Sequence, residues 1–168
     1  MLADVEKSAG ESPAEFSDGS GLKIGIAVAR FNSDITFKMR DLCLARLGEL
    51  GVTVEESQVF EVPGSFELPL AARVLLDPPL SVDGVIAIGV VIRGDTDHYE
   101  HVANAASQGL LRVSEDSLKP VVFGVLTTDT VEQAVERVGQ APGYAESAVE
   151  MVNRLRGVRE RRRGIGLV

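Results

Sequence analysis

The sequence predicts an α/β fold, a three-layer α/β/α sandwich with a four-stranded parallel sheet. Short apolar runs rich in Val and Ile alternate with segments whose apolar residues recur at helical spacing, which is the pattern of repeated strand–helix units. Apolar residues make up 45% of the 168 residues, but aromatic residues only 5%. An aliphatic core of this kind is typical of a parallel sheet covered by helices on both faces.

A single domain is expected, because the chain has the usual length of one domain and no polar linker divides it. Residues 1–21 are rich in Ser, Gly, Glu and Asp and are predicted to form a flexible N-terminal arm. Residues 22–158 are expected to form the α/β domain, and residues 159–168 an Arg-rich C-terminal tail.

The first strand–helix unit begins abruptly after the arm. A near-continuous apolar run over Leu22–Phe31 predicts a buried strand. Asn32 or Ser33 is expected to cap the following helix, which Gly51 ends. Cys43 lies on the apolar stripe of this helix, so it is interpreted as a small core residue rather than a nucleophile.

Two further units follow. A second strand is predicted over residues 52–62, and a helix over residues 65–77 that ends before Pro78-Pro79. The strongest strand signal covers residues 82–94. The helix after it is expected to carry a capping box formed by Asp97 and Glu100.

The fourth strand is predicted over residues 120–128 and a short helix over residues 130–138. A brief break at residues 139–143 is expected before a final helix from about Tyr144 to Arg162. Because strands and helices alternate, the connections should be right-handed crossovers.

The net charge of −8 conceals an asymmetry, because residues 154–168 hold six Arg and one Glu. A solvated helix end, where cations suit the helix dipole, is the favoured interpretation. An anionic partner is the alternative, although no nucleic acid is expected. No secretory signal or membrane span is recognised, and the single cysteine is consistent with a cytoplasmic protein. No metal-binding motif occurs.

Ligands of parallel sheets bind beyond the carboxyl ends of the strands. That rule selects residues 29–33, 63–67, 92–98 and 127–130. These segments contain two Phe, one of the two His, two Arg and a Glu, which is an unusual collection for loops. The functional site is therefore expected at this edge of the sheet.

His98 is the natural proton shuttle, because an imidazole exchanges protons near neutral pH. It follows a turn whose free N–H groups would attract an anion. A surface His near a helix cap is an equally balanced alternative, and His101 is interpreted as a surface residue. Phe31 and Phe66 are either core rim or stacking platforms for a planar ring, and Glu67 either caps its helix or binds hydroxyl groups. No nucleotide phosphate loop is present.

Five phrases in this chain resemble the lumazine synthase family. The resemblance runs from about Leu22 to Leu155, and the phrase containing IRG and His98 is its most specific part. The five phrases are ARFN (29–32), VPGSFELP (62–69), GVVIRGDTDHYEHV (89–102), FGVLTT (123–128) and EQAVERVG (132–139). The resemblance implies a flavodoxin-like sheet.

The resemblance also implies roles for individual residues. Phe31 would stack on a pyrimidine ring, and His98 would be the catalytic histidine. Phe123 and Arg137 would reach the site of a neighbouring subunit, where Arg137 pairs with a phosphate. The remaining residues would hold the ribityl chain and ring (Ser65, Phe66, Glu67), line the pyrimidine pocket (Val90, Val91, Ile92) or contact the ketose phosphate (Asp95, Thr96).

The implied reaction condenses 5-amino-6-(D-ribitylamino)uracil with 3,4-dihydroxy-2-butanone 4-phosphate to give 6,7-dimethyl-8-ribityllumazine, in riboflavin biosynthesis. It needs no cofactor and no metal. The resemblance further implies a homopentamer, which in many members closes into an icosahedral shell of 60 subunits, and riboflavin synthase as a partner.

Two departures from the family pattern are present. The loop after Gly139 is shorter than usual, and no lysine follows Lys119, although family members carry a substrate-binding lysine in that loop. Asp95 also places a carboxylate in the turn that would contact phosphate. The alternative function is therefore an inactive family member that serves as an oligomeric shell or a flavin-binding protein.

Overall fold

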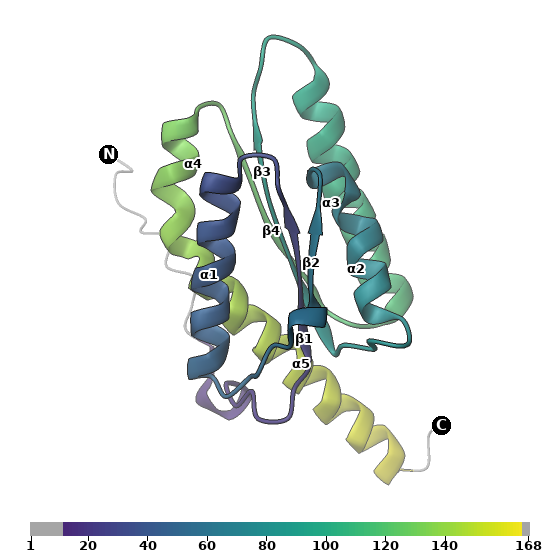
Figure 1. Ribbon diagram of the computed structural model, residues 1–168. Coiled ribbons are helices and arrows are strands. Elements are labelled where there is room, and N and C mark those ends of the chain that lie inside the picture. Colours follow the sequence, from purple (N-terminus) through teal and green to yellow (C-terminus); the bar gives the residue numbers. More distant parts are fainter. Residues whose placement is uncertain (1–11, 166–168) are drawn as a thin grey trace, which may run out of the picture.

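The computed structural model describes residues 12–165, which form a four-stranded parallel sheet with the strand order β2-β1-β3-β4 (Figure 1). Ile26 lies opposite Val59 of β2 and Ile86 of β3, and Ile86 lies opposite Val122 of β4. The strands are β1 (Ile24–Ala29), β2 (Val59–Val62), β3 (Gly84–Ile92) and β4 (Val121–Thr128). The predicted parallel sheet is confirmed.

Helices cover both faces of this sheet, so the predicted three-layer sandwich is also confirmed. One face packs against α1 (Ser33–Glu49), α4 (Val131–Arg137) and α5 (Ala141–Gly164). The other face packs against α2 (Leu68–Leu76) and α3 (His98–Ser117). Figure 1 shows the sheet between these two helical layers.

Side chains of the two central strands alternate between the two cores. In β1, Ile26 and Val28 enter the core with α1 and α5, whereas Ala27 and Ala29 enter the core with α2 and α3. All six residues of β1 are buried. Burial on both faces explains why this strand has a continuous apolar sequence rather than an alternating one.

The second strand is shorter than predicted. Only Val59–Val62 of the expected 52–62 pairs with β1, because a 3₁₀ turn occupies Glu56–Gln58. The buried Gln58 side chain accepts a hydrogen bond from the Glu55 N–H at 2.8 Å. This local hydrogen bond competes with the backbone pairing of a β-strand, so β2 begins only at Val59.

A break between the last two helices is present, but it is shorter than the predicted 139–143, and the final helix begins before the predicted Tyr144. A 3₁₀ turn over Val138–Gln140 joins α4 to α5, which begins at Ala141. Pro142 lies in the first turn of α5, where a residue without an N–H group costs no helical hydrogen bond. The Pro-Gly pair therefore starts a helix here instead of interrupting one.

Both predicted helix caps differ from the structure. Asn32 is the N-cap residue of α1, but it has a left-handed φ of 59° and its side chain makes no capping bond. Asp97 precedes α3 without a side-chain capping bond, so the predicted capping box with Glu100 is wrong. The carboxylate of Glu100 instead lies 3.8 Å from the guanidinium of Arg93.

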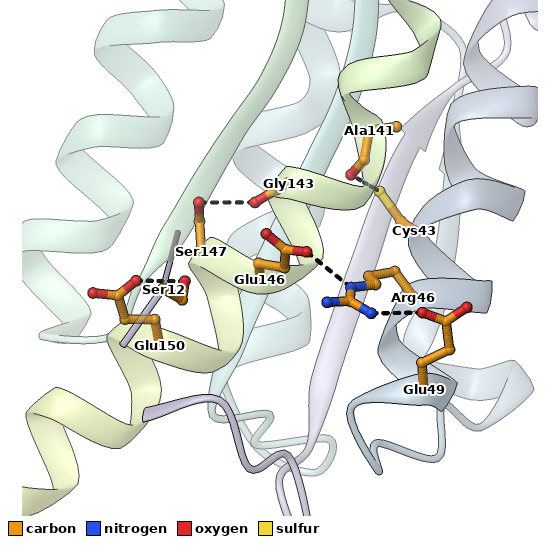
Figure 2. A network of polar contacts seen from close by, with 9 residues as sticks. All are labelled: Ser12, Cys43, Arg46, Glu49, Ala141, Gly143, Glu146, Ser147 and Glu150. Carbon is orange, nitrogen blue, oxygen red and sulfur yellow. Dashed lines mark hydrogen bonds and ion pairs between the residues drawn. The ribbon is translucent and has the colours of Figure 1, made fainter. Parts of the chain in front are cut away.

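The predicted N-terminal arm lies only partly within the described residues, which begin at Ser12. The hydroxyl of Ser12 donates to Glu150 at 2.6 Å (Figure 2). The Asn153 amide donates to the carbonyl oxygens of Phe16 and Asp18 at 2.9 and 2.8 Å. Residues 12–18 are thus joined to α5 by hydrogen bonds.

Figure 2 shows the polar contacts that join α1 to α5. Arg46 bridges Glu146 at 2.9 Å and Glu49 at 2.6 Å, and the hydrogen bonds that its guanidinium donates to Glu49 and Glu146 raise its pKa. The buried Cys43 thiol donates to the carbonyl oxygen of Ala141 at 3.1 Å. The prediction that Cys43 is a core residue is confirmed.

Gly124 is expected to be required for close packing between β4, β3 and α5. A Cβ atom at this position would lie 2.8 Å from the Ala87 carbonyl oxygen and 3.1 Å from the Tyr144 ring. Gly124→Ala should therefore lower the free energy of unfolding by about 1–3 kcal/mol in a denaturant titration. The control is Gly48→Ala in α1, where a Cβ meets nothing within 4 Å. Equal stabilities of the two variants would contradict the prediction.

The Cys43 thiol is expected to resist alkylation in the folded protein. Burial raises its pKa to about 12 from an ordinary value of about 9, so almost no thiolate forms at neutral pH. Because the folded pKa is the higher one, the contribution of Cys43 to stability is complete below pH 9 and is lost as the pH rises toward 12. Iodoacetamide at pH 8 should label the protein only in denaturant, and rapid labelling of the native protein would refute this.

Candidate functional site

A cavity of about 680 Å³ lies at the carboxyl ends of β1, β2 and β3, beside the start of α3. Three of the four predicted segments line it. The lining residues are Phe31 after β1, Pro63–Glu67 after β2, Val90, Val91 and Ile92 at the end of β3, and Gly94, Thr96, His98, Tyr99 and Val102 beyond it. The expectation that ligands bind at this edge thus corresponds to an actual cavity.

Hydrogen bonds extend the sheet into the loop that carries Phe31. The Arg30 N–H donates to Val62 O at 2.8 Å, and the Phe31 N–H donates to Pro63 O at 3.0 Å. The side chain of Asn32 reaches across to the Val90 carbonyl oxygen at 3.4 Å. The backbone beneath the Phe31 ring is therefore held by both neighbouring strands.

Two aromatic rings are presented at the cavity. Phe31 is 72% exposed and Phe66 is 61% exposed, so neither ring is packed in the core. Of the two interpretations left open by the sequence, the core-rim role does not fit these positions. Exposed rings beside a cavity can stack on a flat heterocycle.

The turn that carries Phe66 and Glu67 is fixed close to β3. Glu67 accepts a hydrogen bond from the Gly64 N–H at 2.9 Å, so it caps its own turn. Ser65 is buried, and a side chain at Gly89 of β3 would overlap its Oγ atom. Glu67 also lines the cavity, while its carboxylate holds the turn.

His98 is the first residue of α3, and its exposed side chain lines the cavity. Its imidazole makes no hydrogen bond to any residue between 12 and 165, which leaves both ring nitrogens available to a ligand. The N–H groups of the first turn of α3 favour a bound anion, as does the helix dipole. The His98 imidazole and the N-terminus of α3 therefore lie side by side at the cavity.

Three predicted site residues lie outside the cavity lining. Asp95 is exposed in the turn before α3. Phe123 lies on the edge strand β4 and is partly exposed. Arg137 ends α4, is exposed, and donates to the Gln133 carbonyl oxygen at 2.8 Å.

The fourth predicted segment, residues 127–130, does not contribute to the cavity. Asp129 in this segment instead pairs with Arg93 at 2.8 Å. Conversely, Tyr99 and Val102 line the cavity although the sequence placed them only in the buried stripe of their helix. The signal for Val102 is its spacing, because it lies four residues after His98 and three after Tyr99, and residues three and four apart share one face of a helix.

The described residues contain no group of three His, Cys, Asp or Glu side chains that could hold a metal ion. None of the helices within residues 12–165 has the length and apolar character needed to cross a membrane.

Comparison with known proteins identifies the family. The model of the 6,7-dimethyl-8-ribityllumazine synthase family matches residues 21–156. The 6,7-dimethyl-8-ribityllumazine synthase of Prochlorococcus marinus strain MIT 9215 is 46% identical over 144 residues, which cover 81% of this chain and 90% of the relative. That of Prochlorococcus marinus subsp. pastoris strain CCMP1986 / NIES-2087 / MED4 is 47% identical with the same coverage. The chain therefore belongs to the 6,7-dimethyl-8-ribityllumazine synthase family.

Proposed function

We propose that this protein condenses 5-amino-6-(D-ribitylamino)uracil with 3,4-dihydroxy-2-butanone 4-phosphate to form 6,7-dimethyl-8-ribityllumazine. The observation that carries the proposal is the cavity, whose lining includes two exposed aromatic rings, Phe31 and Phe66, and His98 at the start of α3. The aromatic rings suit a flat pyrimidine, the turn with the Glu67 carboxylate suits a polyhydroxyl chain, and the N-terminus of α3 suits a phosphate. Membership of the family supports this assignment.

In the proposed complex, the pyrimidine ring stacks on Phe31 and lies against Val90, Val91 and Ile92. The ribityl hydroxyl groups meet the turn of Ser65, Phe66 and Glu67, whose carboxylate accepts hydrogen bonds. The ketose phosphate lies at the turn of Asp95 and Thr96, where the first N–H groups of α3 face it. These placements agree with the lining of the cavity, apart from Asp95.

The chemistry requires proton transfers rather than a cofactor. The 5-amino group adds to the ketone, and loss of water gives an imine. Loss of a proton from the carbon that bears the hydroxyl group, together with loss of inorganic phosphate from the next carbon, gives an enol with a terminal methylene group. Transfer of the enol hydroxyl proton to that methylene carbon then gives a methyl group and a carbonyl beside the imine. The ribitylamino nitrogen closes the second ring on that carbonyl and releases a second water. His98 carries protons in these steps, a role worth about 100- to 10,000-fold in rate.

The same proposal makes the active unit an oligomer. Phe123 and Arg137 are exposed and lie outside the cavity of their own chain, as side chains directed to a neighbouring subunit would. A guanidinium offers a phosphate two parallel hydrogen bonds. We infer a homopentamer in the cytoplasm, and we extend this inference to a shell of 60 subunits and to riboflavin synthase as a partner.

One feature favours a second function. No lysine follows Lys119, and α4 continues through a 3₁₀ turn directly into α5 without room for a long substrate-binding loop. A site for an anionic substrate that lacks one cation binds it less tightly. The second candidate is therefore an oligomeric shell or flavin-binding protein without catalytic turnover.

The deciding experiment mixes the purified protein with both substrates and follows lumazine fluorescence against the spontaneous reaction. We expect product to form faster than the background in proportion to enzyme concentration. A rate equal to the background from a protein that still runs as a large oligomer would refute the enzyme and favour the second candidate. Stoichiometric flavin binding, measured on the same sample, would then distinguish a binding protein from an empty shell.

Two variants separate the proposed roles of His98 and Arg137. His98→Ala should lower kcat by about 100-fold or more, with little change in the KM of the ketose phosphate, because proton transfer is lost. Arg137→Ala should mainly raise that KM, since it removes a cation that pairs with the phosphate. Steady-state kinetics with each substrate varied in turn measure both parameters. Equal changes in both parameters for both variants would contradict this division.

A further inference from the structure

Arg93 connects three parts of the molecule at the edge of the cavity, although it does not line the cavity itself. Its Nε atom lies 2.8 Å from the Asp129 carboxylate, beyond β4. Its guanidinium carbon lies 4.6 Å from the centre of the Tyr99 ring in the first turn of α3. A third contact, at 3.8 Å, reaches Glu100. Arg93 thus bridges the end of β4 and the start of α3.

The start of α3 has little else to hold it. Asp97 makes no side-chain capping bond, and residues 93–98 are all exposed. The hydroxyl of Thr96 accepts from the His98 N–H only at 3.4 Å, which is a long hydrogen bond. The helix end that presents His98 therefore lacks the cap that usually fixes such an end.

Asp129, in contrast, is firmly placed. Its N–H donates to the side chain of Gln133 at 2.9 Å, and the buried Thr128 hydroxyl before it donates to Thr130 O at 2.9 Å. The Arg93 backbone N–H also donates to Thr128 O at 2.9 Å, the last bond between the ends of β3 and β4. The backbone from which the Asp129 carboxylate reaches the guanidinium is therefore held in place.

Tyr99 connects the Arg93–Asp129 pair to His98. Its ring packs against the core between the sheet, α2 and α3, and also lines the cavity. With the guanidinium on the ring and the core behind it, Tyr99 holds the first turn of α3. His98 precedes Tyr99 directly, so the same contacts hold the backbone from which its imidazole extends.

We propose that Arg93 is a positioning residue, which places His98 for proton transfer by joining Asp129 to the Tyr99 ring. The inference rests on the proposed function. The ion pair is half exposed, with side chains 50% and 66% accessible, so its contribution to overall stability is small. Its effect on catalysis is larger, because a displacement of about 1 Å at a reacting group costs up to about 100-fold in rate.

The test compares Arg93→Met with a matched control, Arg154→Met. Arg154, in α5, makes the same two kinds of contact. It forms a 2.7 Å ion pair with Glu150, and its guanidinium carbon lies 4.2 Å from the centre of the Phe16 ring. Neither contact involves a residue that lines the cavity. We expect Arg93→Met to lower kcat about 10-fold or more, with the KM of the ketose phosphate changed less than about twofold. Arg154→Met should leave both parameters unchanged. A raised KM with unchanged kcat would overturn the proposal, because Arg93 would then bind substrate directly.

A double-variant cycle separates positioning from general loosening of the fold. If Arg93 acts through His98, Arg93→Met should have almost no further effect on kcat in a His98→Ala background. Arg93→Lys, which keeps a charge opposite Asp129, should recover part of the rate. Equal, additive losses in both backgrounds would overturn the proposal. A wild-type protein without catalysis would instead refute the proposed function, so the two failures are distinguishable.

Discussion

The parallel pairing of β3 with both β1 and β4 is the constraint on which the rest of the structure depends. β3 is buried on both faces, and its neighbours run in the same direction. Every strand therefore ends at the same edge of the sheet, and every connection must return by a helix. The two helical layers and the cavity at the carboxyl edge both follow from this one arrangement.

The central part of the fold could be predicted because burial leaves a strong trace in the sequence. The continuous apolar runs of β1 and β3 reflect burial on two faces, and the position of Cys43 on an apolar stripe correctly placed it in the core. Three of the four loops selected at the carboxyl ends line one cavity. These features depend on residue type and on the spacing at which apolar residues recur, and both can be read directly from a single sequence.

The remaining features depend on specific bonds that residue types do not determine. Gln58 turns its side chain back to the Glu55 N–H and shortens β2. Pro142 lies in the first turn of a helix that was predicted to begin only at about Tyr144. Glu100 approaches Arg93 rather than capping its own helix. Phe123 and Arg137 could be assigned to a site only through family resemblance, because their own chain gives them no contact with the cavity.

The exposure of Phe31 and Phe66 has a thermodynamic consequence for any ligand that fills the cavity. In the free protein both rings present apolar surface to water. A flat ligand that covers them removes this surface from water, and the burial of apolar surface lowers the heat capacity of the complex relative to its separate components. The binding enthalpy therefore becomes more favourable as temperature rises. The balance between the enthalpy and the entropy of binding at this site thus depends on temperature and is not a fixed property of the ligand.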